Sequence, residues 1–169
     1  ESQVQDIALQ VCQALAFLHA HKILHRDIKP SNLIQQPDGR VKLLDFDAAR
    51  TFREDAASDT RLLGTKGFAP PEQYGFAQTD GRSDLFALGK TMAVLLGPAY
   101  HGRLTAIIHK ATQIDAAKRY PDAGSMARAL EHGTWRYGAL HYGLPAAVAL
   151  LLVAGGWWFH QSNQQFNLF

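Results

Sequence analysis

One eight-residue stretch, HRDIKPSN at residues 25–32, concentrates side chains that suit phosphoryl transfer. Such a reaction needs a carboxylate to orient the attacking hydroxyl and accept its proton, oxygen ligands for magnesium, and a cation near the migrating phosphate. Asp27 is a candidate base, and Lys29 is a candidate cation. Asn32 and Asp45 offer the hard oxygen donors that Mg²⁺ prefers. A solvated loop could carry these residue types by chance, but each of them has a use in phosphoryl transfer.

The elements predicted around this stretch would place its side chains together. Apolar residues recur at three- and four-residue steps over residues 2–20, which predicts an amphipathic helix. A short extended piece follows at 23–24. Two apolar runs flank the turn PDG at 37–39 and predict a β-hairpin. Because this hairpin joins Asn32 to Asp45, we expect the two side chains to meet at neighbouring strand ends.

The residue pattern after the hairpin predicts one polar loop followed by three helices. Residues 47–68 are polar and lack periodicity, which indicates a long exposed loop. Residues 84–96 are apolar nearly all round, as is typical of a buried helix. Two further helices are predicted at 103–113 and 122–131.

Composition limits the classes of function. The chain has 169 residues, 47% of them hydrophobic, and a net charge of +2 with acidic and basic residues interspersed, so no nucleic-acid partner is expected. The single cysteine, Cys12, excludes an internal disulfide framework and suggests a buried thiol in a reducing compartment. The eight histidines form no second cluster that would complete a zinc site.

The sharpest break in composition follows Arg136, because no Asp, Glu, Lys or Arg occurs after it. The uncharged run that begins at Tyr142 would form a helix about 27 Å long, close to the roughly 30 Å of a bilayer's hydrocarbon core. Aromatic residues flank the run at both ends, where membrane interfaces favour them. We therefore expect a transmembrane helix at 142–160, with a buried core helix as the alternative. The basic residues before it predict a single-pass protein of the cell membrane whose residues 1–136 are cytoplasmic.

Several ordered motifs resemble those of the eukaryotic-type protein kinases, and specifically the bacterial Ser/Thr kinases of that family. His25-Arg26-Asp27 with Asn32 fits the catalytic-loop pattern, and Lys29 is the residue that Ser/Thr-specific members carry. Asp45-Phe46-Asp47 stands where the family has its magnesium-binding Asp-Phe-Gly. The later landmarks are Pro70-Pro71-Glu72 for Ala-Pro-Glu, Asp84 at the start of the buried helix, and Arg119, which matches the arginine that pairs with Glu72.

The resemblance implies a mainly α (α+β) fold. It predicts a protein-kinase-like C-terminal lobe at residues 1–133, with a short β-hairpin at the catalytic loop. A juxtamembrane linker at 134–141, the transmembrane helix, and a short extracytoplasmic tail at 161–169 would follow. It also implies transfer of the γ-phosphate of ATP, with Mg²⁺ or Mn²⁺, to Ser/Thr hydroxyls of protein substrates, and a homodimer for trans-autophosphorylation. Asp27 and Lys29 would be catalytic, while Lys29, Asn32 and Asp45 would bind the nucleotide and the metal.

Other residues receive structural or regulatory roles from the same resemblance. His25 is expected as a packed loop histidine, Asp84 as a brace, and Glu72 with Arg119 as a buried ion pair. Arg26 would meet a phosphate on the long loop, although an ordinary solvated loop is an equal alternative. The candidate acceptors of that phosphate are Thr60, Ser58 and Thr51. Thr65 is expected to position Asp27 and not to accept phosphate.

Three departures from the family pattern qualify these expectations. No Gly-rich loop, strand lysine or partner glutamate precedes the catalytic loop, so this chain alone is expected to be an inactive fragment of a longer kinase. Asp47 replaces the family glycine, and only a few residues, 97–102, separate the buried helix from the next one. A membrane-held pseudokinase that acts as a binding module is the runner-up reading. A small-molecule phosphotransferase is a third, which the PPE segment fits poorly.

Overall fold

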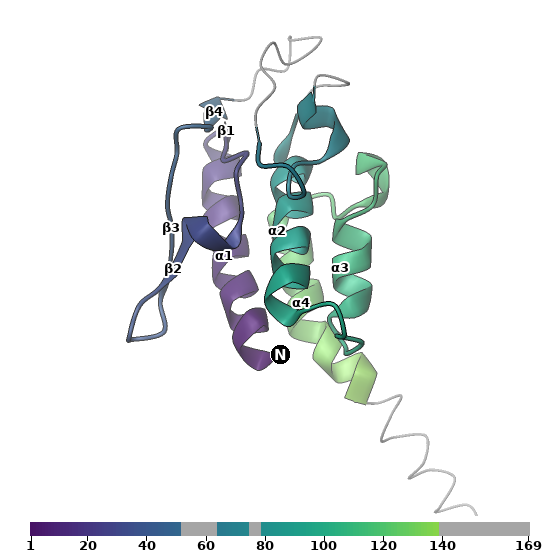
Figure 1. Ribbon diagram of the computed structural model, residues 1–169. Helices are drawn as coiled ribbons and strands as arrows, with labels where there is room; N and C mark the ends of the chain where they lie inside the picture. Colours follow the sequence, from purple (N-terminus) through teal and green to yellow (C-terminus); the bar gives the residue numbers. More distant parts are fainter. Residues whose placement is uncertain (52–63, 75–78, 139–169) are drawn as a thin grey trace, which may run out of the picture. The chain divides into compact units, whose positions relative to one another are not determined.

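The computed structural model describes residues 1–51, 64–74 and 79–138 (Figure 1). The chain divides into two compact units, Glu1–Gly133 and Thr134–Phe169. The candidate phosphosites Ser58 and Thr60 lie outside the described residues, as does the membrane span predicted at 142–160. Among the residues that are described, no helix combines the length and the apolar character needed to cross a membrane.

Four α-helices are the longest elements of the first unit, and the last of them extends beyond Gly133. Helix α1 covers Ser2–Ala20, α2 covers Gly81–Leu96, α3 covers Thr105–Ala111, and α4 begins at Ala123 and ends at Gly138. Helix α2 packs against both α1 and α3, and Figure 1 shows the three side by side. The start of α2 is fixed by its N-cap Asp80, whose side chain accepts a hydrogen bond from the Arg82 amide.

Two small antiparallel sheets flank the catalytic loop. Strand β1 (Ile23–Leu24) pairs with β4 (Arg50–Thr51), and β2 (Leu33–Gln35) pairs with β3 (Val41–Leu43). Gly39 turns the β2–β3 hairpin with φ +84°, a conformation that favours glycine. Three short 3₁₀ helices complete the described elements: η1 (Pro30–Asn32), η2 (Pro71–Tyr74) and η3 (Ala116–Lys118).

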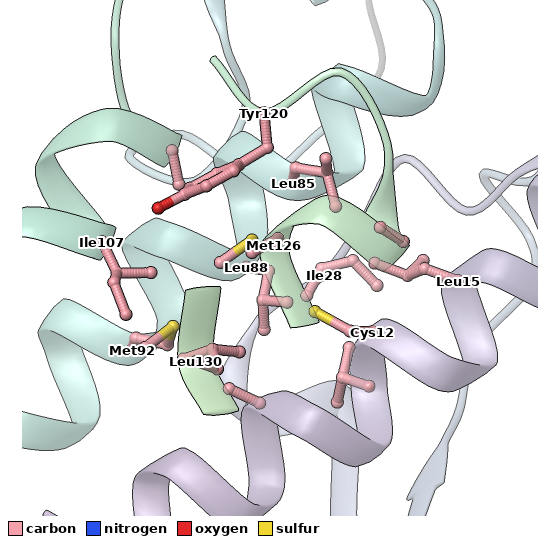
Figure 2. Packing of buried hydrophobic residues seen from close by; sticks show 14 of the residues in the cluster. Cys12, Leu15, Ile28, Leu85, Leu88, Met92, Ile107, Tyr120, Met126 and Leu130 are labelled. Atoms are coloured by element: carbon pink, nitrogen blue, oxygen red, sulfur yellow. The ribbon is translucent and has the colours of Figure 1, made fainter. Parts of the chain in front are cut away.

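The hydrophobic core lies where the four helices meet. Figure 2 shows side chains of α1, α2, α3 and α4 packed in one cluster with the loop residue Ile28, which is fully buried. Cys12 is also buried, as expected, and burial raises the pKa of its thiol to about 12. Because Ile28 follows Asp27 directly, the catalytic loop is anchored in the core by its own apolar residue. The other core residues labelled in Figure 2 are Leu15, Leu85, Leu88, Met92, Ile107, Tyr120, Met126 and Leu130.

Most elements predicted from the sequence are present, with differences at their ends. The first helix, the extended piece and the hairpin are confirmed. The buried helix begins at Gly81, three residues earlier than predicted, and its last turn is not buried, since Val94 and Leu95 are exposed. The residues predicted as one polar loop contain strand β4 at Arg50–Thr51, which the sequence analysis missed because two residues are too few to show periodicity.

Candidate active site

Asp27 lies at the centre of a hydrogen-bonded group of side chains. Lys29 donates from Nζ to Asp27 Oδ2 at 2.6 Å, and Asn32 donates from Nδ2 to the same oxygen at 3.0 Å. Thr65 donates from Oγ1 to Asp27 Oδ1 at 2.7 Å and accepts a hydrogen bond from Lys29 Nζ at 2.9 Å. Both carboxylate oxygens are therefore fixed, while 12% of the Asp27 side chain stays exposed.

The charge state of Asp27 follows from two opposing effects. Burial raises the pKa of this carboxyl, whereas the hydrogen bonds from Lys29, Thr65 and Asn32 and the charge of Lys29 lower it. The second group of effects prevails, so the pKa lies below its ordinary value. Asp27 is therefore ionised at neutral pH, as a proton acceptor must be.

The Asp27 carboxylate opens onto a cleft of about 310 Å³. Asp45 and Asp47 are exposed residues of the same cleft, and the Asp47 amide donates to Asp45 Oδ1 at 3.3 Å. Asp45 has φ +64°, a left-handed conformation that Asp adopts more readily than most residues. Three carboxylates thus line one cavity, and the described residues of its lining are Asp27, Asp45, Asp47, Ala48, Gly64 and Thr65.

The β2–β3 hairpin brings the two predicted metal ligands to adjacent strand ends. Leu33 pairs with Leu43, and the Leu44 amide donates to the Asn32 carbonyl at 2.9 Å. Asp45 follows Leu44 directly. The hairpin therefore brings the backbones of Asn32 and Asp45 to neighbouring strand ends, as predicted. Among the described residues the cleft lining includes Asp45 and not Asn32, so a meeting of the two side chains around a metal stays a prediction.

The donors present suit a magnesium ion bound together with phosphates. Within the part of the chain that the structure describes, no group of three or more His, Cys, Asp or Glu side chains is placed to hold a metal without help. Mg²⁺ in phosphoryl-transfer sites uses one or two protein ligands and completes its shell with phosphate oxygens and water. The exposed Asp45 carboxylate meets that requirement, and Asn32 uses only its Nδ2 in the bonds to Asp27, so its amide oxygen is not part of them.

Asp84 supports the catalytic loop from its buried side. This residue is fully buried in the first turn of α2. Its Oδ1 accepts the Arg26 amide at 2.7 Å, and its Oδ2 accepts the His25 amide at 3.0 Å. Arg26 has φ +68°, which is uncommon for a residue with a long side chain. The two hydrogen bonds hold the backbone in this conformation immediately before Asp27.

His25 connects the catalytic loop to the end of β3. Its ring is buried, its Nε2 lies 3.1 Å from the Leu44 carbonyl oxygen, and its edge packs on Phe46 with 4.8 Å between ring centroids. Burial lowers the pKa of His25 and outweighs the opposing effect of the Asp84 charge. The imidazole ring is therefore neutral at pH 7 and packs inside the protein, as predicted from the sequence.

Glu72 and Arg119 form a buried, two-pronged ion pair. Arg119 Nη1 lies 2.5 Å from Glu72 Oε1, and Nη2 lies 3.0 Å from Oε2. Ser83 Oγ also donates to Glu72 Oε1 at 2.9 Å, and the Arg119 guanidinium lies over the Phe86 ring at 4.8 Å. The remaining Arg119 donors bind backbone carbonyls, so this buried charge is well satisfied. The pair joins the PPE segment to α2 and the loop that follows α3.

Two residues of the site escaped the sequence analysis. Gln73 donates from Nε2 to the Arg26 carbonyl at 2.8 Å, and His19 places Nε2 2.8 Å from Asp84 Oδ2. Neither belongs to a short motif with a distinctive spacing, and both contacts link segments far apart in the sequence. Only the tertiary structure could show them.

The predicted regulatory contact of Arg26 is not tested by the described residues. Arg26 is 1% exposed and therefore lies within the protein. Of the candidate acceptors, Thr51 is in β4, while Ser58 and Thr60 lie in the stretch that the structure does not describe. Phosphorylation of this loop stays a prediction.

Comparison with known proteins agrees with this geometry. The profile of the protein kinase domain matches residues 1–126. Serine/threonine-protein kinase ppk23 of Schizosaccharomyces pombe is 38% identical over 106 residues, which are 61% of this chain and 27% of that protein. Serine/threonine-protein kinase PknB of Mycolicibacterium smegmatis is 37% identical over 94 residues, or 54% of this chain and 15% of that protein.

A third relative is cyclin-dependent kinase 7 of Caenorhabditis elegans, which is 38% identical over 96 residues, or 56% of this chain and 29% of that protein. The chain thus spans less than a third of the length of these curated relatives. They include a bacterial protein and eukaryotic ones, so the resemblance is not restricted to bacterial kinases. Since the profile covers well over half of the chain, and Asp27 and Asp45 of two motifs line one cleft, the chain belongs to the protein kinase domain family.

Proposed function

We propose that the protein containing this chain is a Ser/Thr protein kinase, which transfers the γ-phosphate of ATP to serine or threonine hydroxyls of other proteins. The observation that carries the proposal is the ionised, partly exposed Asp27 carboxylate. Lys29, Thr65 and Asn32 hold it at the rim of the cleft that Asp45 also lines. The similarity to the kinases named above gives it further support.

Each residue would contribute one part of the reaction. Asp27 orients the substrate hydroxyl and accepts its proton, because its carboxylate is ionised and the residue lines the cleft. Lys29 Nζ, which contacts both Asp27 and Thr65, places a positive charge next to the position of the transferred phosphate. Asn32 and Asp45 would hold a divalent cation, which when bound neutralises charge on the ATP phosphates.

The substrate class is inferred from the neighbourhood of Asp27. Lys29 two residues after the base is the residue expected in Ser/Thr-specific members, and its bond to Thr65 closes one side of the site. Ser/Thr kinases are also what the names of ppk23 and PknB state. A tyrosine hydroxyl stands farther from the peptide backbone than a serine hydroxyl. A substrate backbone bound at one fixed distance from Asp27 would therefore not place both kinds of hydroxyl correctly.

The direct test uses the full-length protein with γ-labelled ATP, Mg²⁺ or Mn²⁺ and a generic protein substrate. We expect label on serine or threonine, and none on tyrosine, after phosphoamino-acid analysis. Asp45→Asn should reduce the rate by roughly 10²-fold or more, because a neutral amide replaces the proposed anionic metal ligand.

Asp47→Asn is the matched control, since it removes an equally exposed carboxylate two residues away and should have a much smaller effect. Full-length protein that transfers no phosphate would instead favour the runner-up, a pseudokinase that acts by binding. Asp47 in place of the family glycine supports that alternative.

The membrane location is a separate proposal that rests on the sequence. The uncharged run at 142–160 would form a single span in the cell membrane, with the kinase portion on the cytoplasmic side because the preceding segment carries the basic residues. Fractionation should recover the full-length protein with the membranes after a high-salt and carbonate wash. A variant without residues 142–160 should stay in the supernatant. Washed membranes that carry no protein would contradict the proposal.

A further inference from the structure

The Asp84 carboxylate has a third donor, and it comes from outside the catalytic loop. His19, in the last turn of α1, places Nε2 2.8 Å from Asp84 Oδ2. A carboxylate at neutral pH only accepts hydrogen bonds, so Nε2 carries the hydrogen. The Asp84 side chain has no exposed surface, and that of His19 has 17%. Oδ2 is thus shared between the imidazole ring and the His25 amide, while Oδ1 binds the Arg26 amide.

The imidazole ring fits against the first residue of α2. A Cβ added at Gly81 would lie 2.7 Å from His19 Nδ1 and 2.9 Å from its Cε1. Real Cβ atoms essentially never come so close to a neighbour, and the backbone of Gly81 is in an ordinary conformation. Space for the His19 ring is therefore what requires glycine here. The ring is fixed from one side by Gly81 and from the other by Asp84.

We propose that His19 is a positioning residue for the active site. By binding Oδ2, it orients the Asp84 carboxylate so that both oxygens reach the amides of the catalytic loop. Those two bonds keep Arg26 at φ +68° and set the position of Asp27, the next residue. His19 is not among the described residues that line the cleft, so its proposed action on Asp27 passes through Asp84. This proposal rests on the proposed function, because it assumes that Asp27 acts as the catalytic base.

The most direct test measures hydrogen exchange at the two amides that Asp84 accepts, by NMR on the whole chain. His19→Phe keeps a ring but removes the donor, so exchange at the His25 and Arg26 amides should become roughly tenfold faster. Core amides such as that of Leu88 report global opening and should change less. His19→Gln keeps an N–H at a similar reach and should restore most of the protection.

His21→Gln provides the matched control at the end of the same helix. The ring of this exposed histidine bonds only to the Phe17 carbonyl among the described contacts. The His21→Gln substitution should leave hydrogen exchange at the His25 and Arg26 amides unchanged. Exchange in His19→Phe that equals the wild-type rate, or that rises only as much as at Leu88, would overturn the proposal.

A second variant tests the steric part of the inference. Gly81→Ala should speed exchange at the same two amides, because the new methyl group displaces the His19 ring. Alanine is favoured over glycine within a helix, so weakening of α2 would not explain the effect. In a His19→Ala background the clash is gone, and Gly81→Ala should then add nothing. An equal effect of Gly81→Ala in both backgrounds would contradict the proposed contact.

Kinetics of the full-length protein connect this geometry to the reaction. His19→Phe should lower kcat about tenfold with little change in the KM for ATP, and His19→Gln should recover most of the loss. The exchange experiment needs no phosphate transfer. A protein without kinase activity would therefore overturn the proposed function while the exchange rates still decide whether His19 positions the loop.

Discussion

Asp84 and Asp27 are two carboxylates on opposite sides of the same loop, and their surroundings differ. Asp84 has no exposed surface, and two of its three donors are backbone amides. Asp27 keeps part of its surface, receives its hydrogen bonds from the side chains of Lys29, Asn32 and Thr65, and faces a cleft.

The difference shows how one chemical group can serve stability or chemistry. Donors that belong to the backbone cannot be moved without distorting the chain, so Asp84 is suited to fix the loop. Donors on side chains can rearrange when a substrate arrives, so Asp27 is suited to receive a proton. Loss of the buried carboxylate should therefore reduce stability, and loss of the one in the cleft should reduce turnover.

The largest effect on stability is expected at the other buried acid, Glu72. Glu72→Ala would leave the Arg119 guanidinium buried without its anion and should lower the free energy of unfolding by about 3–5 kcal/mol. Asp38→Ala is the matched control, because it breaks an ion pair with Arg40 at a similar N–O distance, in which the side chains are 47% (Asp38) and 78% (Arg40) exposed. It should leave the denaturation midpoint unchanged. Equal shifts in urea denaturation would remove the distinction between buried and exposed groups.

A smaller loss is expected from Asp84→Asn. An amide has one acceptor oxygen where the carboxylate has two, so at least one of the donors from His19, His25 and Arg26 would lack a partner. Leaving a buried donor unsatisfied costs about 1–3 kcal/mol. Urea denaturation of the variant measures this loss, and wild-type stability would show that the three hydrogen bonds do not hold the loop.

The smallest effect concerns pH and Asp27. Its pKa is lower in the folded protein than in the unfolded chain, so its contribution to stability is present above the unfolded pKa of about 3.9. That contribution disappears as the pH falls through the still lower folded pKa. Asp27→Asn should therefore flatten the decline of stability below about pH 4, because the variant lacks this contribution at every pH, and it should lower stability near pH 7 by the same small amount. A wild-type acid decline in the variant would show that the pKa of Asp27 is not lowered.

The residues at the cleft were predicted from the sequence better than the residues that support the catalytic loop from its buried side. The hairpin between Asn32 and Asp45 follows from two short apolar runs and a turn signal, both of which are local. The order of the motifs predicted the Glu72–Arg119 pair, although 47 residues separate its members. Both features were predictable because they leave a recognisable pattern in the amino-acid sequence.

The contacts that the sequence could not predict are those between distant segments without a motif. His19 reaches Asp84 across 65 positions, and Gln73 reaches the Arg26 carbonyl across 47. Strand β4 pairs with β1 over only two residues, too few to leave a periodic signal. Burial separates Asp84 from Asp27 more clearly than residue type does, and burial is a property of the folded chain.

The central claim is that Asp27 is the catalytic base, and the kcat of Asp27→Asn in the full-length protein tests it most directly. Removing a general base should lower kcat by roughly 10²- to 10⁴-fold. The KM for ATP and the thermal midpoint should change little, because Asp27 is neither buried like Asp84 nor a proposed metal ligand. A kcat within a few-fold of wild type, in protein that is folded and binds ATP normally, would contradict the account.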